Sequence, residues 1–200
     1  MEDAKPVKSP METNYLKEMN CQDNPLPTNT QYRKAIGELL YLTTATRPDI
    51  AATVGILCRK ASMPSKKDWN AVKRIIRYLK GTSHYKLKLP ASNEITLTGY
   101  VDADWAGDTS DRKSTSGYLF FLSGGAISWT SRKQLSVTLS STEAEYVAAA
   151  QASQEVIWLR QLLTDLGQPQ LGPTEIMRTI KDALYLRTWK ELIQEPSTLM

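Results

Sequence analysis

The chain has 200 residues, of which 41% are hydrophobic and 23% charged, a balance typical of a folded globular protein rather than of a disordered chain. Its net charge of +4 permits a polyanionic partner but does not require one. Two cysteines, Cys21 and Cys58, and one histidine, His84, are too few for a disulfide framework or a zinc site.

The first segment, residues 1–30, contains four prolines and shows no regular hydrophobic spacing, so we predict an extended arm. It lacks the apolar stretch that a signal peptide requires. Nowhere does the chain contain the run of about 18 apolar residues that spans a bilayer. We therefore expect a cytoplasmic or nuclear protein without a membrane partner.

Residues 31–90 predict a helical segment. Apolar residues recur at steps of three and four along its first part, which indicates helices at about 31–46 and 49–61. The break between these two helices is placed at Pro48, because a proline disfavours helical backbone in the residue before it.

A third helix is predicted at about 66–80. Ser65 is a suitable N-cap, and Gly81 suits the left-handed residue that often ends a helix. The apolar face, which includes Trp69, is expected to pack in a core together with Tyr78. The opposite face of this helix is basic. It is either a plain solvated surface or a weak nucleic-acid-binding site, and both alternatives stay open. The basic face consists of Lys66, Lys67, Lys73, Arg74, Arg77 and Lys80.

Residues 91–176 predict an α+β domain. Apolar and polar residues alternate in several short runs, as they do in half-buried strands. A long apolar-periodic stretch between the third and fourth runs begins with the serines and threonine of an N-cap, near Ser141, and extends to about Leu166. We predict strands at 95–102, 117–122, 126–131 and 171–176, with this single long helix against them.

Two carboxylates of this domain are candidate metal ligands. Asp102 lies near the end of the first predicted strand, and Glu145 is predicted in the first turn of the long helix. Two-metal hydrolysis needs several carboxylates on rigid neighbouring elements, holding two Mg²⁺ ions roughly 3.5–4 Å apart. Asp102 and Glu145 supply half of such a site. Asp104, Asp108 and Asp111 are interpreted as acids of turns and loops.

Several motifs of the chain, in the same order, resemble the RNase H domain of Ty1/copia retrotransposons. They read GYVDADWAGD (99–108), DRKSTSGY (111–118), ISWTSRK (127–133) and LSSTEAEYVA (139–148). Residues 5–16, 32–50 and 69–82 are similar to the segment that follows the copia reverse-transcriptase palm. The resemblance spans about residues 5–176. It implies a Pol polyprotein fragment, with a reverse-transcriptase tail (31–90) and a truncated RNase H-like domain (91–176) but without the polymerase palm.

The resemblance assigns Asp102 as the first metal ligand and Glu145 as the second. A third ligand, an aspartate, is expected directly after the fourth strand, and a fourth further on. Two of four ligands make an incomplete site, so we expect no catalysis and no cofactor; Mg²⁺ is the cofactor only if residual activity exists. Where the family has an aromatic residue, a Glu and the third-ligand Asp, this sequence has Met177, Arg178 and Thr179.

Residues 177–200 depart from the family pattern. Their apolar residues are spaced as in an amphipathic helix, and we predict that this novel helix covers the edge that a truncated sheet leaves open. Asp182 is a conceivable substitute ligand, but it lies three residues past the expected position, which makes it a poor one.

Three functional interpretations stay open. The first is a catalytically inactive, retrotransposon-derived protein that binds RNA–DNA hybrids weakly through the basic helix. The second is a residual Mg²⁺-dependent ribonuclease H. The third is a co-opted interaction protein with an unknown protein partner, such as a secreted RxLR-type effector of a plant pathogen. The sequence Leu184-Tyr185-Leu186-Arg187 lacks the leading arginine of the RxLR motif.

Overall fold

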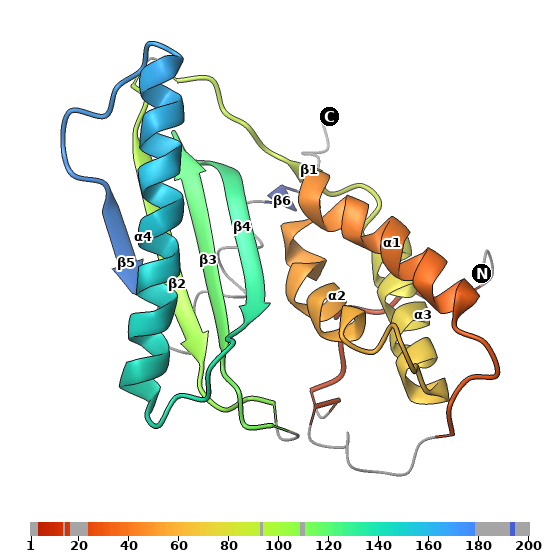
Figure 1. Ribbon diagram of the computed structural model, residues 1–200. Coiled ribbons are helices and arrows are strands. Elements are labelled where there is room, and N and C mark those ends of the chain that lie inside the picture. The colour runs from red at the N-terminus through yellow and green to blue at the C-terminus, as the bar shows by residue number, and fades with distance from the viewer. Residues whose placement is uncertain are drawn as a thin grey trace. The chain divides into compact units, whose positions relative to one another are not determined.

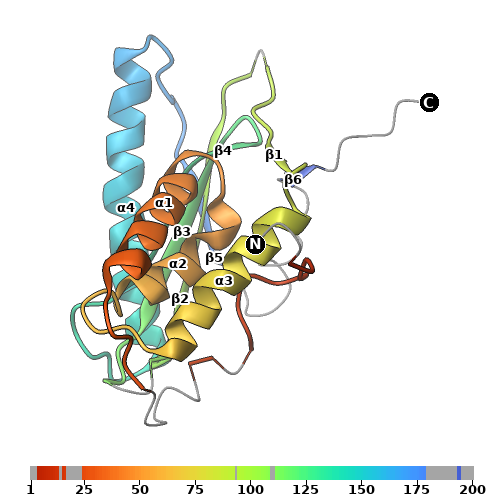
Figure 2. The ribbon, with the colours of Figure 1, turned by 90° about the vertical axis from the view of Figure 1, so that its right-hand side faces the viewer.

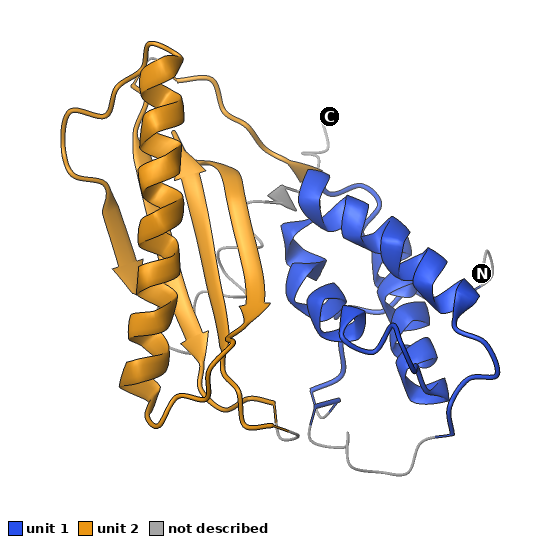
Figure 3. Cartoon of the chain, viewed as in Figure 1, with its two compact units in different colours: residues 1–85, 198–200 blue, residues 86–197 orange. Residues whose placement is uncertain are grey.

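The structure is a computed structural model that describes residues 4–13, 15–16, 24–92, 94–108 and 111–178, together with the backbone of residues 193–194. The chain divides into two compact units, shown in different colours in Figure 3. Unit 1 comprises residues 1–85 and 198–200, and unit 2 comprises residues 86–197. None of the helices in the described part of the chain combines the length and apolar composition needed to cross a membrane.

Unit 1 contains the three predicted N-terminal helices (Figure 1). The prediction at 49–61 is corrected at both ends: the region opens with a 3₁₀ turn that has Pro48 at its first position, and its α-helix ends at Cys58. Proline suits a first helical position because its missing N–H would have no partner there. The elements are α1 (Thr30–Ala45), the 3₁₀ turn η1 (Pro48–Ile50), α2 (Ala51–Cys58) and α3 (Lys66–Gly81).

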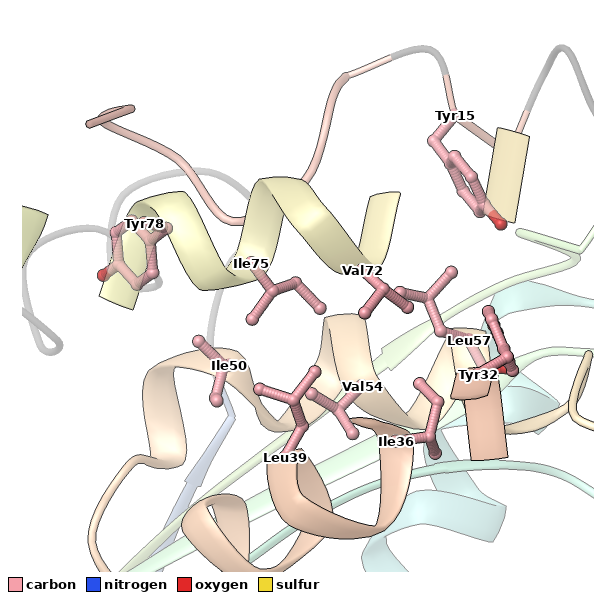
Figure 4. Packing of buried hydrophobic residues seen from close by; sticks show 10 residues of the cluster. All are labelled: Tyr15, Tyr32, Ile36, Leu39, Ile50, Val54, Leu57, Val72, Ile75 and Tyr78. Carbon is pink, nitrogen blue, oxygen red and sulfur yellow. The ribbon is translucent and has the colours of Figure 1, made fainter. Parts of the chain in front are cut away.

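The core of unit 1 lies between these helices. In Figure 4, Val72 and Ile75 point from α3 toward Ile50 and Val54, and all four side chains are fully buried. Trp69 packs against this cluster and Tyr78 belongs to it, so the predicted core position of both aromatic residues is confirmed. The cluster consists of Tyr15, Tyr32, Ile36, Leu39, Ile50, Val54, Leu57, Val72, Ile75 and Tyr78.

The two ends of α3 differ in how well the sequence predicts them. Ser65 is the N-cap, as expected: its side chain accepts a hydrogen bond from the Asp68 amide while the Asp68 side chain accepts one from the Ser65 amide. Gly81 is not the left-handed terminator that the sequence suggests. It is the last helical residue, Thr82 caps the helix, and the positive-φ glycines of the described chain are Gly124 and Gly167.

Unit 2 is built around a four-stranded mixed sheet in the order β4-β3-β2-β5. The pairs β2–β3 and β3–β4 are antiparallel, whereas β2 and β5 are parallel. The long helix α4 lies along one face of this sheet (Figures 1 and 2), which confirms the predicted α+β fold. The elements are β2 (Leu97–Asp104), β3 (Thr115–Leu122), β4 (Gly125–Lys133), α4 (Ser141–Asp165) and β5 (Glu175–Arg178), with a separate antiparallel pair, β1 (Lys86–Leu87) and β6 (Ile193–Gln194).

Small residues allow α4 to lie close to the sheet. Ala144, Ala148 and Ala152 are fully buried against strand residues such as Val101. On the sheet itself, Gly99 leaves room for the Phe120 ring, because a Cβ at position 99 would stand 2.5 Å from Phe120 Cε1. The close fit of the helix and the two central strands therefore depends on the absence of larger side chains at these positions.

The C-terminal part differs from the sequence prediction. The fourth strand was expected at 171–176, but β5 begins at Glu175 and continues through Arg178. Met177 and Arg178, predicted as the start of a helix, instead pair with Tyr100 and Val101 of β2. Hydrogen bonding to a neighbouring strand outweighs the local helical pattern here. Residues 193–194 of the same predicted helix form β6. The remainder of that prediction, with Asp182, lies outside the described residues.

Candidate functional site

Asp102 lies near the carboxyl end of β2, one of the two central strands. It pairs with Gly117 of β3, and its side chain is half-buried. Alternate residues of β2 pack under α4, which fixes the strand rigidly against the helix. A carboxylate at this position is therefore held on a stable element, as a metal ligand must be.

Glu145 is the fifth residue of α4, so it lies just beyond the first turn in which it was predicted. The acid of the first turn is Glu143, which accepts a hydrogen bond from the Leu139 amide, while Ser140 caps the helix by accepting from the Glu143 amide. Glu143 is thus engaged in holding the start of α4. Glu145 is the α4 carboxylate that the sequence analysis predicts as a metal ligand.

Arg178 forms an ion pair with Glu145. The distance from Arg178 Nη2 to Glu145 Oε2 is 2.5 Å, and the two side chains are 68% and 22% exposed. Arg178 is paired with Val101 across the parallel strands, and paired residues point to the same face of a sheet. Val101 packs against α4, so Arg178 also points to the α4 side and reaches Glu145.

The pairing changes the electrostatics of the candidate site. A guanidinium is charged at all ordinary pH values, and it repels a divalent cation. A Mg²⁺ ion bound by Glu145 would have to displace Arg178 or share the carboxylate with it. Within the described residues, no group of three or more His, Cys, Asp and Glu side chains is arranged to hold a metal ion. Thr179, which stands at the expected position of the third ligand, lies outside the described residues.

The acids that follow Asp102 hold a loop. Lys133 is the last residue of β4, and its Nζ lies 2.5 Å from Asp108 Oδ2 and 2.7 Å from Asp111 Oδ2. The hydrogen bond from Lys133 lowers the pKa of Asp111. Burial alone would lower the pKa of Lys133, but the hydrogen bonds to the two aspartates raise it. Asp108 and Asp111 are loop acids, as the sequence predicts, whereas Asp104 is the last residue of β2.

The basic face of α3 is in contact with the N-terminal arm. Arg74, Arg77 and Lys80 donate hydrogen bonds to residues 4–12, and the ammonium of Lys67 lies over the ring of Tyr15, also in the arm. Lys73 lies over the ring of Trp69 on α3 itself. Lys66, Lys73 and Lys80 are exposed. The prediction overlooked one sign of this docking: apolar residues recur every four positions, at Val7, Met11 and Tyr15, and all three pack in or against the core of unit 1.

A buried polar network in unit 1 was not predicted from the sequence. Arg47 binds both carboxylate oxygens of Asp49, at 2.9 and 2.7 Å, and its Nη2 donates to Thr82 Oγ1 at 2.7 Å. Tyr78 donates to Asp49 Oδ2 at 2.8 Å, and its pKa is raised by burial and by the Asp49 charge. The network ties η1 to the end of α3. The charged and polar groups of this network bind one another, so we interpret the network as a structural one.

No family model matches the chain. The chain is 46% identical over 175 residues to the Pol polyprotein of transposon TNT 1-94 from Nicotiana tabacum, a match that covers 85% of this chain and 13% of that protein. It is 44% identical over 183 residues to the Pol polyprotein of transposon RE2 from Arabidopsis thaliana, covering 92% of this chain and 12% of that protein. It is also 52% identical over 131 residues to a Plasmopara viticola protein named secreted RxLR effector protein 161, covering 66% of this chain and 92% of that protein.

Three antiparallel strands, a parallel edge strand and a long helix packed on their sheet define an α+β domain. The chain belongs to the Ty1/copia family of retrotransposon Pol polyproteins and corresponds to a fragment of them. Because it spans only 12–13% of the length of those polyproteins, their activities do not pass to it by similarity alone.

Proposed function

We propose that the chain is a catalytically inactive, RNase H-like derivative of a retrotransposon Pol polyprotein. The observation that carries this proposal is the ion pair between Arg178 and Glu145. Hydrolysis by two metal ions needs carboxylates that are free to bind them. Here Glu145, one of the two candidate carboxylates, is bound to a cation of the chain itself.

The residues of β5 support the same conclusion. The family has a Glu at the position of Arg178, so the substitution exchanges a negative for a positive charge next to the candidate site. A carboxylate and a guanidinium act on a divalent cation in opposite directions. Asp102 and Glu145 therefore mark an ancestral site rather than a working one. On this proposal no metal cofactor is used.

Hydrolysis of an end-labelled RNA–DNA hybrid tests the proposal. The full chain is incubated with the hybrid in Mg²⁺ and, separately, in Mn²⁺, with the Asp102→Asn variant as the control. We expect no cleavage by either protein above the rate without protein. Metal-dependent cleavage by the natural sequence that disappears in Asp102→Asn would establish the alternative, a residual ribonuclease H, and overturn the proposal.

We also propose weak, sequence-independent binding of nucleic acid by α3. Its exposed lysines Lys66, Lys73 and Lys80 can pair with phosphates, and such binding weakens steeply as salt rises. A filter-binding series with an RNA–DNA hybrid at increasing salt is the test. Retention at about 50 mM salt that falls with added salt supports binding, and no retention at that concentration contradicts it.

A second candidate function is that of an interaction protein, because the relative of 52% identity is named a secreted effector. The matches to this relative and to the RE2 polyprotein cover 131 and 183 of 200 residues, so they overlap on this chain. Similarity to the effector is therefore also similarity to Pol sequence, and it does not discriminate between the two. Recovery of the tagged product of the natural gene from the culture medium, rather than from the cells, would favour the effector.

A further inference from the structure

The N-terminal arm lies along the basic face of α3 and runs antiparallel to it. Near the end of the helix, Lys80 Nζ donates to the Ala4 carbonyl at 3.1 Å and Arg77 Nε donates to the Lys5 carbonyl at 2.7 Å. One turn earlier, Arg74 Nε donates to the Ser9 carbonyl at 3.2 Å and its Nη2 to the Ser9 hydroxyl at 3.1 Å. Arg74 Nη1 also pairs with Glu12 at 3.0 Å. Three cations of the helix therefore face acceptors of one short segment.

The two ends of the arm are held with different strength. Tyr15 is 4% exposed, and its hydroxyl is hydrogen-bonded to the buried carboxylate of Asp68. At the other end, the contacts of Arg77 and Lys80 with the backbone are exposed to solvent. Exposed hydrogen bonds open at lower free energy than buried ones. Residues 4–12 can therefore leave the helix while Tyr15 keeps the arm attached.

Gly81 provides a specific fit for the arm. A Cβ at this position would stand 2.9 Å from Pro6 Cβ, a distance that side chains do not tolerate without a shift. Because the backbone of Gly81 is helical, the glycine is not required for a turn. Its lack of a side chain instead allows Pro6 to approach the helix.

The chemistry of these contacts is that of a phosphate-binding surface. Guanidinium and ammonium groups donate to oxygen acceptors, and the negative charge of a phosphate oxygen attracts them more strongly than a neutral carbonyl does. Apart from Glu12, the arm offers Arg74, Arg77 and Lys80 neutral oxygens. The positive charge of this face is therefore only partly neutralised while the arm is docked.

We propose that residues 4–12 and the phosphate backbone of a nucleic acid compete for Arg74, Arg77 and Lys80. The docked arm then lowers the affinity of α3 for nucleic acid, and a bound strand releases the arm. This inference rests on the proposed nucleic-acid binding of α3. While the arm is docked, its carbonyl oxygens accept the hydrogen bonds that phosphate oxygens would accept in the complex with nucleic acid.

The test uses Gly81→Ala, which presses on Pro6 without changing any charge. Gly37→Ala is the matched control, since Gly37 also lies within a helix and an added Cβ there meets nothing within 4 Å. Two quantities are measured on the full chain: the rate of tryptic cleavage after Lys8, which reports release of the arm, and the dissociation constant for a labelled RNA–DNA hybrid. The triple substitution Arg74→Ala, Arg77→Ala and Lys80→Ala is added to Gly81→Ala to test whether any gain in affinity for the hybrid depends on these three cations.

We expect Gly81→Ala to speed cleavage and to tighten binding, by up to roughly tenfold if the arm covers the face about nine-tenths of the time. The triple substitution should abolish the gain, and Gly37→Ala should change neither quantity. Faster cleavage with unchanged, measurable affinity would overturn the inference and leave the binding proposal standing. Absence of binding in every variant would instead overturn the binding proposal. If Gly81→Ala leaves cleavage unchanged, the double substitution Val7→Ser and Met11→Ser is used instead, because it removes the apolar contacts of the arm with the core of unit 1. Cleavage and affinity are then measured and interpreted in the same way.

Discussion

Arg178 on the edge strand β5 and Glu145 near the start of α4 form an ion pair, with 2.5 Å between Nη2 and Oε2. The pair joins two residues that are 33 positions apart in the chain. It also brings a permanent positive charge to one of the two carboxylates that a metal-dependent nuclease of this family would use. The relationship between these two residues is the basis for interpreting the domain as an inactive one.

The ion pair itself should contribute little to stability. Because the Arg178 side chain is 68% exposed, we expect Arg178→Ala to lower the free energy of unfolding by less than about 1 kcal/mol. Arg160 on α4 is the comparison, since it donates to the carbonyls of Gln170 and Gly172 and to the Thr174 hydroxyl. Arg160→Ala should cost about 1–3 kcal/mol in urea unfolding. An equal loss in both variants would mean that Arg178 serves mainly to support the fold.

The Arg47 network should be essential for unit 1. Arg47 is 9% exposed, and its removal leaves Asp49 buried with one partner fewer. We expect Arg47→Met to destabilise the protein by about 3–5 kcal/mol, the usual cost of breaking a buried ion pair. Arg33→Met, on the exposed side of α1, is the control and should stay within about 0.5 kcal/mol. Similar urea midpoints for the two variants would contradict this role.

The stability supplied by Lys133 and Asp111 should depend on pH. The pKa of Asp111 is lowered from 3.8 in the folded protein, so its contribution is present above pH 3.8 and is lost as the pH falls below it. The pKa of Lys133 is raised from 10.5, so its contribution is present below pH 10.5 and is lost as the pH rises past it. Urea unfolding should therefore show a larger cost of Asp111→Asn at pH 7 than at pH 3. The same cost at both pH values would show that the ion pair is not the cause.

Gly99 should not tolerate a side chain. A methyl group there would stand 2.5 Å from Phe120 Cε1 in a fully packed region, and we expect Gly99→Ala to cost about 1–3 kcal/mol. Phe120→Leu in the same chain should recover part of that loss, because a smaller side chain leaves room for the methyl group. Gly172→Ala, where nothing lies within 4 Å, should be nearly neutral in the same thermal or urea unfolding measurement. Strict additivity of Gly99→Ala and Phe120→Leu would argue against the clash.

Most of the elements could be predicted because their signals are local. The helical periodicity around Leu39, the capping box of Ser65 and Asp68, and the alternation along β2 all lie within a few residues. The alternation of residues 95–102 placed Asp102 on its strand, and the serines and threonine of the N-cap placed Glu145 near the start of its helix. The local patterns do not predict which side chains these residues contact in the folded chain.

The contacts that were missed are long-range ones. Arg77 binds the carbonyl of Lys5, which is 72 residues away in the chain. Because every residue has a backbone carbonyl, the sequence does not indicate which one a side chain will bind. Gly81 was interpreted as a helix terminator because glycine serves that purpose often, whereas its role is to accommodate Pro6. Arg178 was recognised as a departure from the family, but its pairing with Glu145 depends on β5 lying parallel to β2 with Val101 as its neighbour.

A titration with Mn²⁺, followed by the electron paramagnetic resonance signal of the free ion, measures whether Asp102 and Glu145 hold a divalent cation while Arg178 is present. The natural sequence is compared with the double variant Arg178→Glu and Thr179→Asp, which restores the carboxylates of the family motif. We predict that the double variant binds Mn²⁺ at least about tenfold more tightly than the natural sequence, and that Glu145→Gln removes the gain. Binding by the natural sequence as tight as that of the double variant, and lost in Asp102→Asn, would show that Arg178 does not block the metal site and would overturn the proposed inactivity.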